Sequence, residues 1–277
     1  MNKTKCIICS NEVYSNELQA HELACMENKS AELYKLNYKI KVDLTKHQQL
    51  ALEYSQQKAK EYSLKAYDSL TNKFTALQMN EKDMNSIINY LVNVAPLIIH
   101  INLDDNLEHL CNDIYYRTQL QNGIADHQKK LFNNLYNNTN SFHTVKYGVF
   151  NLTNDLNGVN SCIRYGDSSL LLRNNIKNRT TLLFNNNKEI GTFDNLYHIL
   201  NQLPDDLLIK LFKLSIGEET SYPSEYDFYI ECQFHGEILI ERDVEGLFVN
   251  RRHIGDNKIA NLLTVFNEKH KSSIVWI

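Results

Sequence analysis

Apolar residues follow two different patterns along the chain, and the change between them comes near residue 96. Before it, a stretch without Gly or Pro carries apolar side chains at roughly helical spacing, namely Leu50, Tyr54, Leu64, Tyr67 and Leu70. Thr45, with Gln48 three residues on, has the pattern of a capping box and predicts the start of this helix. A further helix is expected over residues 81–94, because Pro96 disfavours helical geometry at the residue before it.

After Pro96 the apolar residues come in short runs rich in Ile, Val, Tyr, Phe and Thr, separated by Gly, Asn and Asp. Such runs predict strands, and they read PLIIHINL, IYYRTQL, KYGVFNL, RYGDSSLLL, RTTLLF, DFYIECQFHGEILI and VEGLFVN. A helical insertion, FDNLYHILNQL with DDLLIKLFKL, lies between the fifth and the sixth run. This order predicts an α+β fold with a mixed, antiparallel sheet core. The chain has neither G-x-G-x-x-G nor a phosphate-binding lysine loop, which argues against doubly wound and P-loop folds.

The N-terminal segment contains four side chains of the kind that bind metal ions: Cys6, Cys9, His21 and Cys25. The first two thiols, separated by two residues, form a knuckle, and a His and a Cys four positions apart share one helix face. Together they predict a tetrahedral zinc site. So short a segment buries too little apolar surface to fold alone, so zinc would supply the missing stability. Chance spacing of three cysteines and a histidine is the alternative.

The pattern Cys-x2-Cys-x11-His-x3-Cys resembles the ubiquitin-binding zinc finger of DNA-repair proteins, over about the first tenth of the chain. The resemblance implies structural zinc and ubiquitin as a ligand. That family has an acidic residue two positions after the His, where this chain has Leu23, with Glu22 one position earlier. A finger that packs on its neighbour or holds another protein therefore stays open. The expected domains are a finger over 1–30, a helical connector or scaffold over 31–95 and a mixed domain over 96–277.

The net charge and the cysteines of the chain limit its expected partners and the cellular compartment in which it is expected to act. The 277 residues carry a net charge of −4 with 22% charged residues, which gives no strong attraction for nucleic acid. Cys111, Cys162 and Cys232 are scattered outside the finger, and free thiols beside a zinc site indicate a reducing, intracellular compartment. The chain shows no signal-peptide core and no apolar run of membrane length, so we expect no membrane partner.

The strand over 229–236 has the most suggestive chemistry. Alternation places Glu231, Gln233 and His235 on one face and apolar side chains on the other. A polar face on an otherwise apolar strand is expected where that face lines a cleft, and an exposed strand face is the alternative.

Two further segments contain residues that bind anions or ligands. Arg117 stands among the strand-forming aromatics of YYRTQ, where it either reaches the surface or holds an anion. Arg164 precedes the pair Ser168-Ser169 at a strand start, where the hydroxyls form a turn or bind a ligand.

Arg, then Ser-Ser at a strand start, then Glu on a polar-faced strand resembles the order found in ADP-ribosyltransferases. The segments YYRTQLQNG, KYGVFNL, IRYGDSSLLL, RTTLLF and YIECQFHGEILIERDVEGLFV further resemble, block by block, a bacterial family long without a known function and related to the CteC-type effectors. Those effectors ADP-ribosylate threonine on host ubiquitin. The resemblance covers much of the region from about residue 44 to residue 256, with YR-[ST]-Q-x3-G and E-x-Q-x-H-G-E as its most specific blocks.

This resemblance implies an ADP-ribosyltransferase-like domain that uses NAD as co-substrate and modifies ubiquitin, in the host cytosol if the chain is a bacterial effector. It implies a catalytic set of Glu231, Arg117, Ser168 and Ser169. It implies that NAD is bound by Arg117, Gln119, His100, Arg164, Ser168 and Gln233.

One departure leaves the function open. Better-known ADP-ribosyltransferases carry Glu-x-Glu or Gln-x-Glu with the second residue essential, whereas this chain has Glu231 before Gln233. Either the register differs, or Glu237 takes the role, or the activity is altered or lost. A hydroxyl acceptor such as threonine fits better than arginine. The alternatives are a non-catalytic adaptor, in which the finger binds ubiquitin or another protein, and a transferase with a different acceptor.

Overall fold

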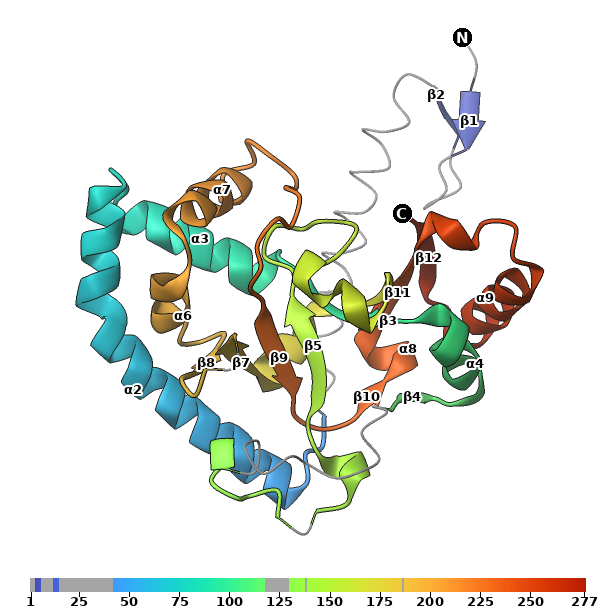
Figure 1. Cartoon of the computed structure of the whole chain (residues 1–277), viewed down its shortest axis with the longest axis horizontal. Helices are drawn as coiled ribbons and strands as arrows, with labels where there is room; N and C mark the ends of the chain where they lie inside the picture. The colour runs from blue at the N-terminus through green and yellow to red at the C-terminus, as the bar shows by residue number, and fades with distance from the viewer. Residues whose placement is uncertain (1–2, 6–11, 15–41, 118–129, 138, 186) are drawn as a thin grey trace. The chain divides into compact units, whose positions relative to one another are not determined.

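The computed structural model describes residues 3–5, 12–14, 42–117, 130–137, 139–185 and 187–277 (Figure 1). The chain divides into two compact units, residues 1–42 and residues 43–277. In the first unit, β1 (Lys3–Lys5) and β2 (Glu12–Tyr14) form an antiparallel pair. The four predicted zinc ligands, Cys6, Cys9, His21 and Cys25, lie outside the described residues.

The second unit is built on a sheet whose described strands follow the order β12-β11-β6-β3-β5-β9-β7-β8. Every neighbouring pair is antiparallel except β11 and β12, which are parallel. The prediction of an α+β fold with a mostly antiparallel core is therefore confirmed. The strands are β3 (Leu97–Ile101), β5 (Lys146–Phe150), β6 (Ser168–Leu172), β7 (Thr180–Phe184), β8 (Ile190–Thr192), β9 (Ile230–Phe234), β11 (Val244–Val249) and β12 (Ser273–Trp276).

A separate short ribbon joins two distant parts of the chain. It pairs β4 (Tyr115–Tyr116) with β10 (Ile238–Leu239) in antiparallel fashion, and Tyr116 lies opposite Ile238. Because Arg117 directly follows β4 and Glu237 directly precedes β10, this ribbon brings those two side chains to the same end of the sheet.

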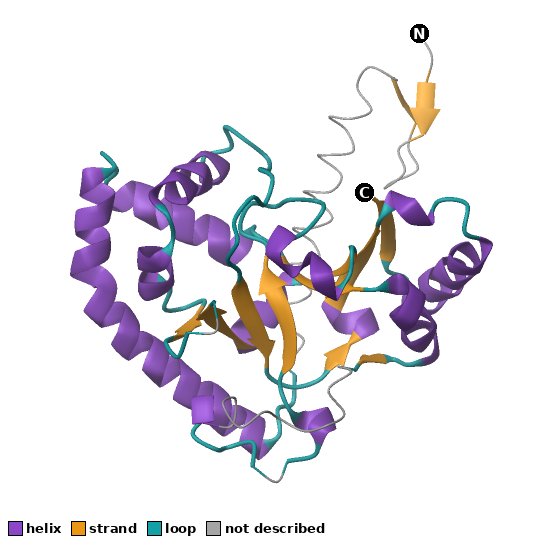
Figure 2. Cartoon of the chain, in the orientation of Figure 1, coloured by secondary structure: helices purple, strands orange, loops and turns teal. Residues whose placement is uncertain are grey.

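Helices flank the sheet at both ends (Figure 2). Figure 1 shows α2 and α6 beside β7 and β8, α3 and α7 next to each other beyond α6, and α4 and α9 on the side of β12. The helices are α2 (Lys46–Ala76), α3 (Glu81–Asn93), α4 (Leu103–Asn112), α6 (Tyr197–Gln202), α7 (Asp205–Ser215), α8 (Ile240–Asp243) and α9 (Asn257–His270). Short 3-10 turns are η1 (Ser141–His143), η2 (Asn160–Tyr165), η3 (Asn174–Arg179) and η4 (Arg251–His253). None of the helices in the described ranges combines the length and apolarity that crossing a bilayer requires.

The helical region begins as predicted. Thr45 caps α2, and its capping box with Gln48 is complete, since each residue bonds the backbone amide of the other. Helix α3 ends at Asn93, three residues before Pro96. Helix α2 packs against α6 and β8, so these helices belong to the same compact unit as the sheet. The domain boundary that we predicted at 95/96 therefore does not separate two units.

The two faces of the sheet have different surroundings. Leu97, Ile99 and Phe234 point into the main hydrophobic core. Ile98 and Val149 point to the opposite face, where a smaller apolar cluster forms against the segment that contains η2. The second face of the sheet therefore carries this smaller cluster together with the polar side chains of β9.

A buried ion pair connects the ends of several strands. Arg179 donates to Asp243 at 2.9 Å, and the two side chains are 6% and 0% exposed. Arg179 also donates to the backbone carbonyl of His235 at 2.6 Å, and Asp243 accepts from Arg242 and from the amide of Leu239. Because each charge is satisfied by the other and by these neighbours, the pair ties β7, β9 and β10 together.

We predict that Asp243→Asn lowers the free energy of unfolding by about 3–5 kcal/mol, because it leaves the Arg179 guanidinium buried without a counter-charge. Urea denaturation measures the change. The double variant Arg179→Met, Asp243→Leu removes both charges and should be more stable than either single variant. The control is Lys58→Met, which breaks a surface pair with Glu61 and should stay close to the wild type. Equal stability of Asp243→Asn and this control would contradict the prediction.

Candidate functional site

The polar face of β9 exists as predicted. Val149 lies opposite Glu231 and Tyr147 opposite Gln233, so the two polar residues of β9 share one face. Gln233 donates through Nε2 to Glu231 Oε1 at 2.7 Å. Gln233 is 1% exposed, whereas Glu231 is half-buried. The amide oxygen of Gln233 has no hydrogen-bond partner among the described residues.

The same face continues across β5 and β3 to β6. Ile98 lies opposite both Val149 and Leu171, and two residues along the strand His100 lies opposite Ser169. Since antiparallel partners point to the same face, Ser169 and His100 share the face of Glu231 and Gln233. The strands β6 and β9 are three strand spacings apart, which is about 14 Å.

The two serines have different surroundings. Ser169 is buried, and its hydroxyl has no hydrogen-bond partner among the described residues. Ser168 points to the opposite face and accepts a hydrogen bond at 3.1 Å from the backbone amide of Asn250. The structure thus places Ser169, but not Ser168, on the face that carries Glu231.

His100 holds a loop against this face. Its Nδ1 lies 2.8 Å from the carbonyl oxygen of Gly166, and its Nε2 accepts from the amide of Val159 at 3.0 Å. This arrangement requires the neutral ring with the proton on Nδ1. Burial lowers the pKa of His100, consistent with that form. Gly158 has a φ of +85°, and a Cβ there would lie 2.6 Å from the ring, so only glycine fits. His100 is therefore a loop anchor, with both ring nitrogens engaged.

Arg117 lies at the end of the sheet beside Glu237. It forms an ion pair with Asp113, and its guanidinium carbon lies 4.8 Å from the centre of the Phe142 ring. The charge of Glu237 reaches Arg117 and also Lys146, whose pKa is lowered to about 8 chiefly by burial. No described contact joins Arg117 to Glu231. Of the two candidate catalytic acids, Glu237 is the one whose charge acts on Arg117.

The remaining predicted NAD ligands lie apart from Arg117. Arg164 is exposed on η2, with its guanidinium carbon 4.9 Å from the centre of the Tyr165 ring. Cys162 lies within electrostatic reach of both Arg164 and Glu231, and burial raises the pKa of its thiol to about 11. The η2 turn therefore brings Arg164 toward the polar face of β9. Gln119 lies outside the described residues.

His235 completes the polar side of β9 but lies in the interior. Its ring nitrogens lie 2.8 Å from the Tyr136 hydroxyl and 2.8 Å from the Thr181 hydroxyl. Burial, with a smaller contribution from Arg179, lowers the pKa of His235 to about 3. The ring is neutral and structural.

Sequence reasoning missed the residues around Arg117. Asp113 and Phe142 contact its guanidinium, and Gln48 and Lys146 hold the turn that carries Phe142. Lys146 opens the strand KYGVFNL, and a lysine within an otherwise apolar run was the available signal. The partners of these residues come from distant parts of the chain, so no spacing in the sequence indicates them.

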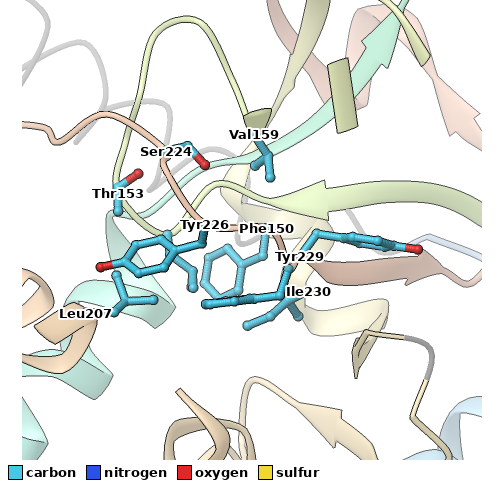
Figure 3. Close-up of a pocket in the computed structure, with 10 residues that line it drawn as sticks. Phe150, Thr153, Val159, Leu207, Ser224, Tyr226, Tyr229 and Ile230 are labelled. Carbon is cyan, nitrogen blue, oxygen red and sulfur yellow. The ribbon is translucent and has the colours of Figure 1, made fainter. Parts of the chain in front are cut away.

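A small pocket opens next to the start of β9. Figure 3 shows the rings of Phe150 and Tyr226 lining it together with Leu207. Its volume of about 20 Å³ is enough for a water molecule but not for a dinucleotide. None of the residues in the predicted catalytic set lines it.

Neither the models of known protein families nor the curated proteins contain a match to this chain. Within the described ranges, no three His, Cys, Asp or Glu side chains come together as a metal site.

We predict that stability falls as the pH drops from 7 to 5, because two buried histidines stay neutral in the folded protein. The pKa of His235 is about 3 and that of His198 about 4, both lowered chiefly by burial, against about 6.5 in an unfolded chain. At pH 5 the unfolded state binds protons that the folded state does not, and each histidine then costs about 2 kcal/mol. The stability that depends on neutral His235 and His198 is therefore present near pH 7 and is lost progressively as the pH falls below about 6.5.

Urea denaturation at pH 7 and pH 5 measures this loss. In His235→Gln the decrease between the two pH values should be about 2 kcal/mol smaller than in the wild type, whatever its stability at pH 7. The control His109→Gln replaces an exposed histidine and should keep the wild-type pH dependence. A full decrease in His235→Gln would show that His235 is not the titrating group.

Proposed function

We propose that this protein is an NAD-dependent mono-ADP-ribosyltransferase that modifies a protein acceptor, with a threonine of ubiquitin as the target. In this reaction the bond between nicotinamide and C1′ of its ribose breaks. A bond forms between C1′ and the acceptor hydroxyl oxygen. Nicotinamide leaves, and the hydroxyl proton passes to solvent.

The observation that carries the proposal is the row of polar side chains on one face of β6, β3, β5 and β9. Two buried polar atoms on this face, the amide oxygen of Gln233 and the hydroxyl of Ser169, have no hydrogen-bond partner in the described part of the chain. Such atoms are rare in folded proteins, since an unpaired buried polar group costs about 1–3 kcal/mol. A polar ligand that pairs with them accounts for their presence, and both amide and hydroxyl groups suit a nucleotide.

Glu231 is our candidate for the carboxylate that the chemistry requires. Positive charge develops on the ribose as nicotinamide leaves, and a carboxylate stabilises it. Glu231 is accessible enough to meet a substrate, and the hydrogen bond from Gln233 orients its carboxylate. The order Glu231-Cys232-Gln233 then has a physical reason, because the Gln233 amide donates a hydrogen bond to the Glu231 carboxylate.

Glu237 is less suited to that role. Its charge is shared among Arg117, Lys146 and Arg242, and His143 Nδ1 lies 3.9 Å from its carboxylate. A carboxylate that already compensates several cations stabilises a new positive charge poorly. We assign Glu237 as the counter-charge of this cluster and Arg117 as a ligand for the diphosphate.

The N-terminal finger supports ubiquitin as the acceptor through its resemblance to a ubiquitin reader. A reader tethered to a transferase raises the effective concentration of the acceptor without new contacts at the catalytic face. The two resemblances, finger and body, point to the same partner independently.

The test is incubation of the full chain with NAD and ubiquitin, followed by mass spectrometry of ubiquitin. The wild type should add one ADP-ribose to a threonine. Glu231→Gln should reduce kcat by about 10²–10³-fold, because the charge that opposes the developing cation is gone. Glu237→Gln should act mainly on KM for NAD, and the exposed control Glu108→Gln should match the wild type. Unmodified ubiquitin with no release of nicotinamide would overturn the proposal.

A non-catalytic adaptor is the second candidate, favoured by the order of Glu231 before Gln233, which differs from that of better-known ADP-ribosyltransferases. Calorimetry separates the two functions. An adaptor binds ubiquitin but not NAD, and its ubiquitin binding disappears when a chelator removes zinc or when Cys6→Ser removes a predicted ligand. Binding of NAD by the wild type would exclude it.

A further inference from the structure

Two buried side chains bind the backbone carbonyls of the turn at residues 142–144, which lies beside Arg117. Lys146 Nζ donates to the carbonyl of Phe142 at 2.6 Å and to that of Thr144 at 2.8 Å. Gln48 Nε2 donates to the carbonyl of His143 at 2.7 Å. Three consecutive carbonyls are thus bound by two side chains, each 1% exposed. Buried hydrogen bonds of this kind are costly to break, so the turn has one conformation.

The side chain that this turn presents is the ring of Phe142. One neighbour of the ring is the guanidinium of Arg117, at 4.8 Å from its centre, and another is the edge of Tyr115, with ring centres 5.5 Å apart. The ammonium of Lys146 lies 5.6 Å from the same ring centre. A guanidinium over an aromatic face gains about 0.5–1 kcal/mol at an exposed site. The ring therefore restrains Arg117 as well as touching it.

Asp113 restrains the same guanidinium from another element. The carboxylate binds Arg117 through Nε and is itself fixed by the amides of Ile114 and Tyr115. Because Asp113 uses Nε, the terminal nitrogens of the guanidinium are the ones suited to bind a phosphate in the bidentate manner. Asp113 and Phe142 thus hold an arginine that remains more than half exposed.

We propose that Phe142, Lys146 and Gln48 are positioning residues, which form a rigid platform that holds the Arg117 guanidinium ready for an anionic group of the substrate. An arginine side chain carries about 2 kcal/mol of rotamer entropy, and restraint before binding removes part of that cost from the binding step. The identity of the anion as the diphosphate of NAD rests on the proposed function. The platform itself rests on the contacts above.

The first experiment measures Arg117 without any ligand. In ¹⁵N-labelled full-length protein, the Nε–Hε signal of Arg117, assigned with Arg117→Lys, should show restricted motion on the picosecond-to-nanosecond timescale. Phe142→Leu and Lys146→Met should make this group mobile, whereas Phe142→Tyr should keep it restricted. Arg164, which stacks on Tyr165 elsewhere, provides the internal control and should not respond. Equal motion of Arg117 in the wild type and in Phe142→Leu would overturn the platform.

The second experiment measures NAD. Phe142→Leu should raise KM for NAD about threefold and Lys146→Met about tenfold, with kcat within about twofold of the wild type. Phe142→Tyr should restore the wild-type KM. The matched control is Lys177→Met, which removes another buried lysine that binds backbone carbonyls, at the opposite end of β5. It should lower stability without changing KM, and an equal rise in KM there would contradict a positioning role.

The two experiments distinguish the inference from the function on which it draws. If Arg117 is restrained by Phe142 but the wild type neither binds nor consumes NAD, the proposed function fails and the platform stands. If the wild type consumes NAD but Arg117 moves freely in all variants, the function stands and the platform fails.

Discussion

The antiparallel register of β6, β3, β5 and β9 is the constraint on which the candidate site depends. Side chains alternate between the two faces of a strand, so a shift of one residue would move Glu231 and Gln233 into the main core and bring Cys232 to the polar face. Such a shift would also bury a carboxylate without a partner, which the apolar core does not tolerate. The hydrophobic core therefore specifies the site indirectly, because only this register keeps Glu231 and Gln233 off the face that packs into the main core.

Buried polar side chains that bind backbone carbonyls recur in this fold. Lys177 donates to three carbonyls at the end of α3, Arg179 binds the carbonyl of His235, and Lys146 holds the turn at Phe142. In each case a basic side chain fixes the end of a helix or strand, or a turn, by binding its carbonyl groups. These hydrogen bonds restrain segments that the hydrogen bonds of the sheet do not reach. A binding site needs such restraint, because its side chains must be held in one geometry.

Local signals in the sequence were enough for much of the fold. The capping box at Thr45, the end of α3 before Pro96 and the alternation along β9 depend on residues close in the chain, and the structure agrees with all three. The helices α4 and α9 and the strand β12 were not anticipated. The strand β12 is only four residues long and mostly exposed, so it carries no alternation of buried and exposed positions.

The candidate site was predictable only in part. The common face of Glu231 and Gln233 follows from alternation, but the separation of Ser168 from Ser169 follows from which strand lies next to β6. The proximity of Arg117 to Glu237 depends on the pairing of β4 with β10, whose residues are more than a hundred positions apart. Because β4 and β10 are only two residues long each, the sequence has no alternation of apolar and polar residues that would predict their pairing.

The side-chain amide of Gln48 takes part in both the N-terminal cap of α2 and the turn at Phe142. Its oxygen accepts the Thr45 amide at the start of α2, while its nitrogen binds the carbonyl of His143. Fraying of the first turn of α2 would therefore weaken the turn at Phe142 as well, because it removes one of the two side chains that bind the carbonyls of that turn. A helix cap, which usually affects only the helix it begins, here couples the local melting of α2 to a turn 95 residues further along the chain.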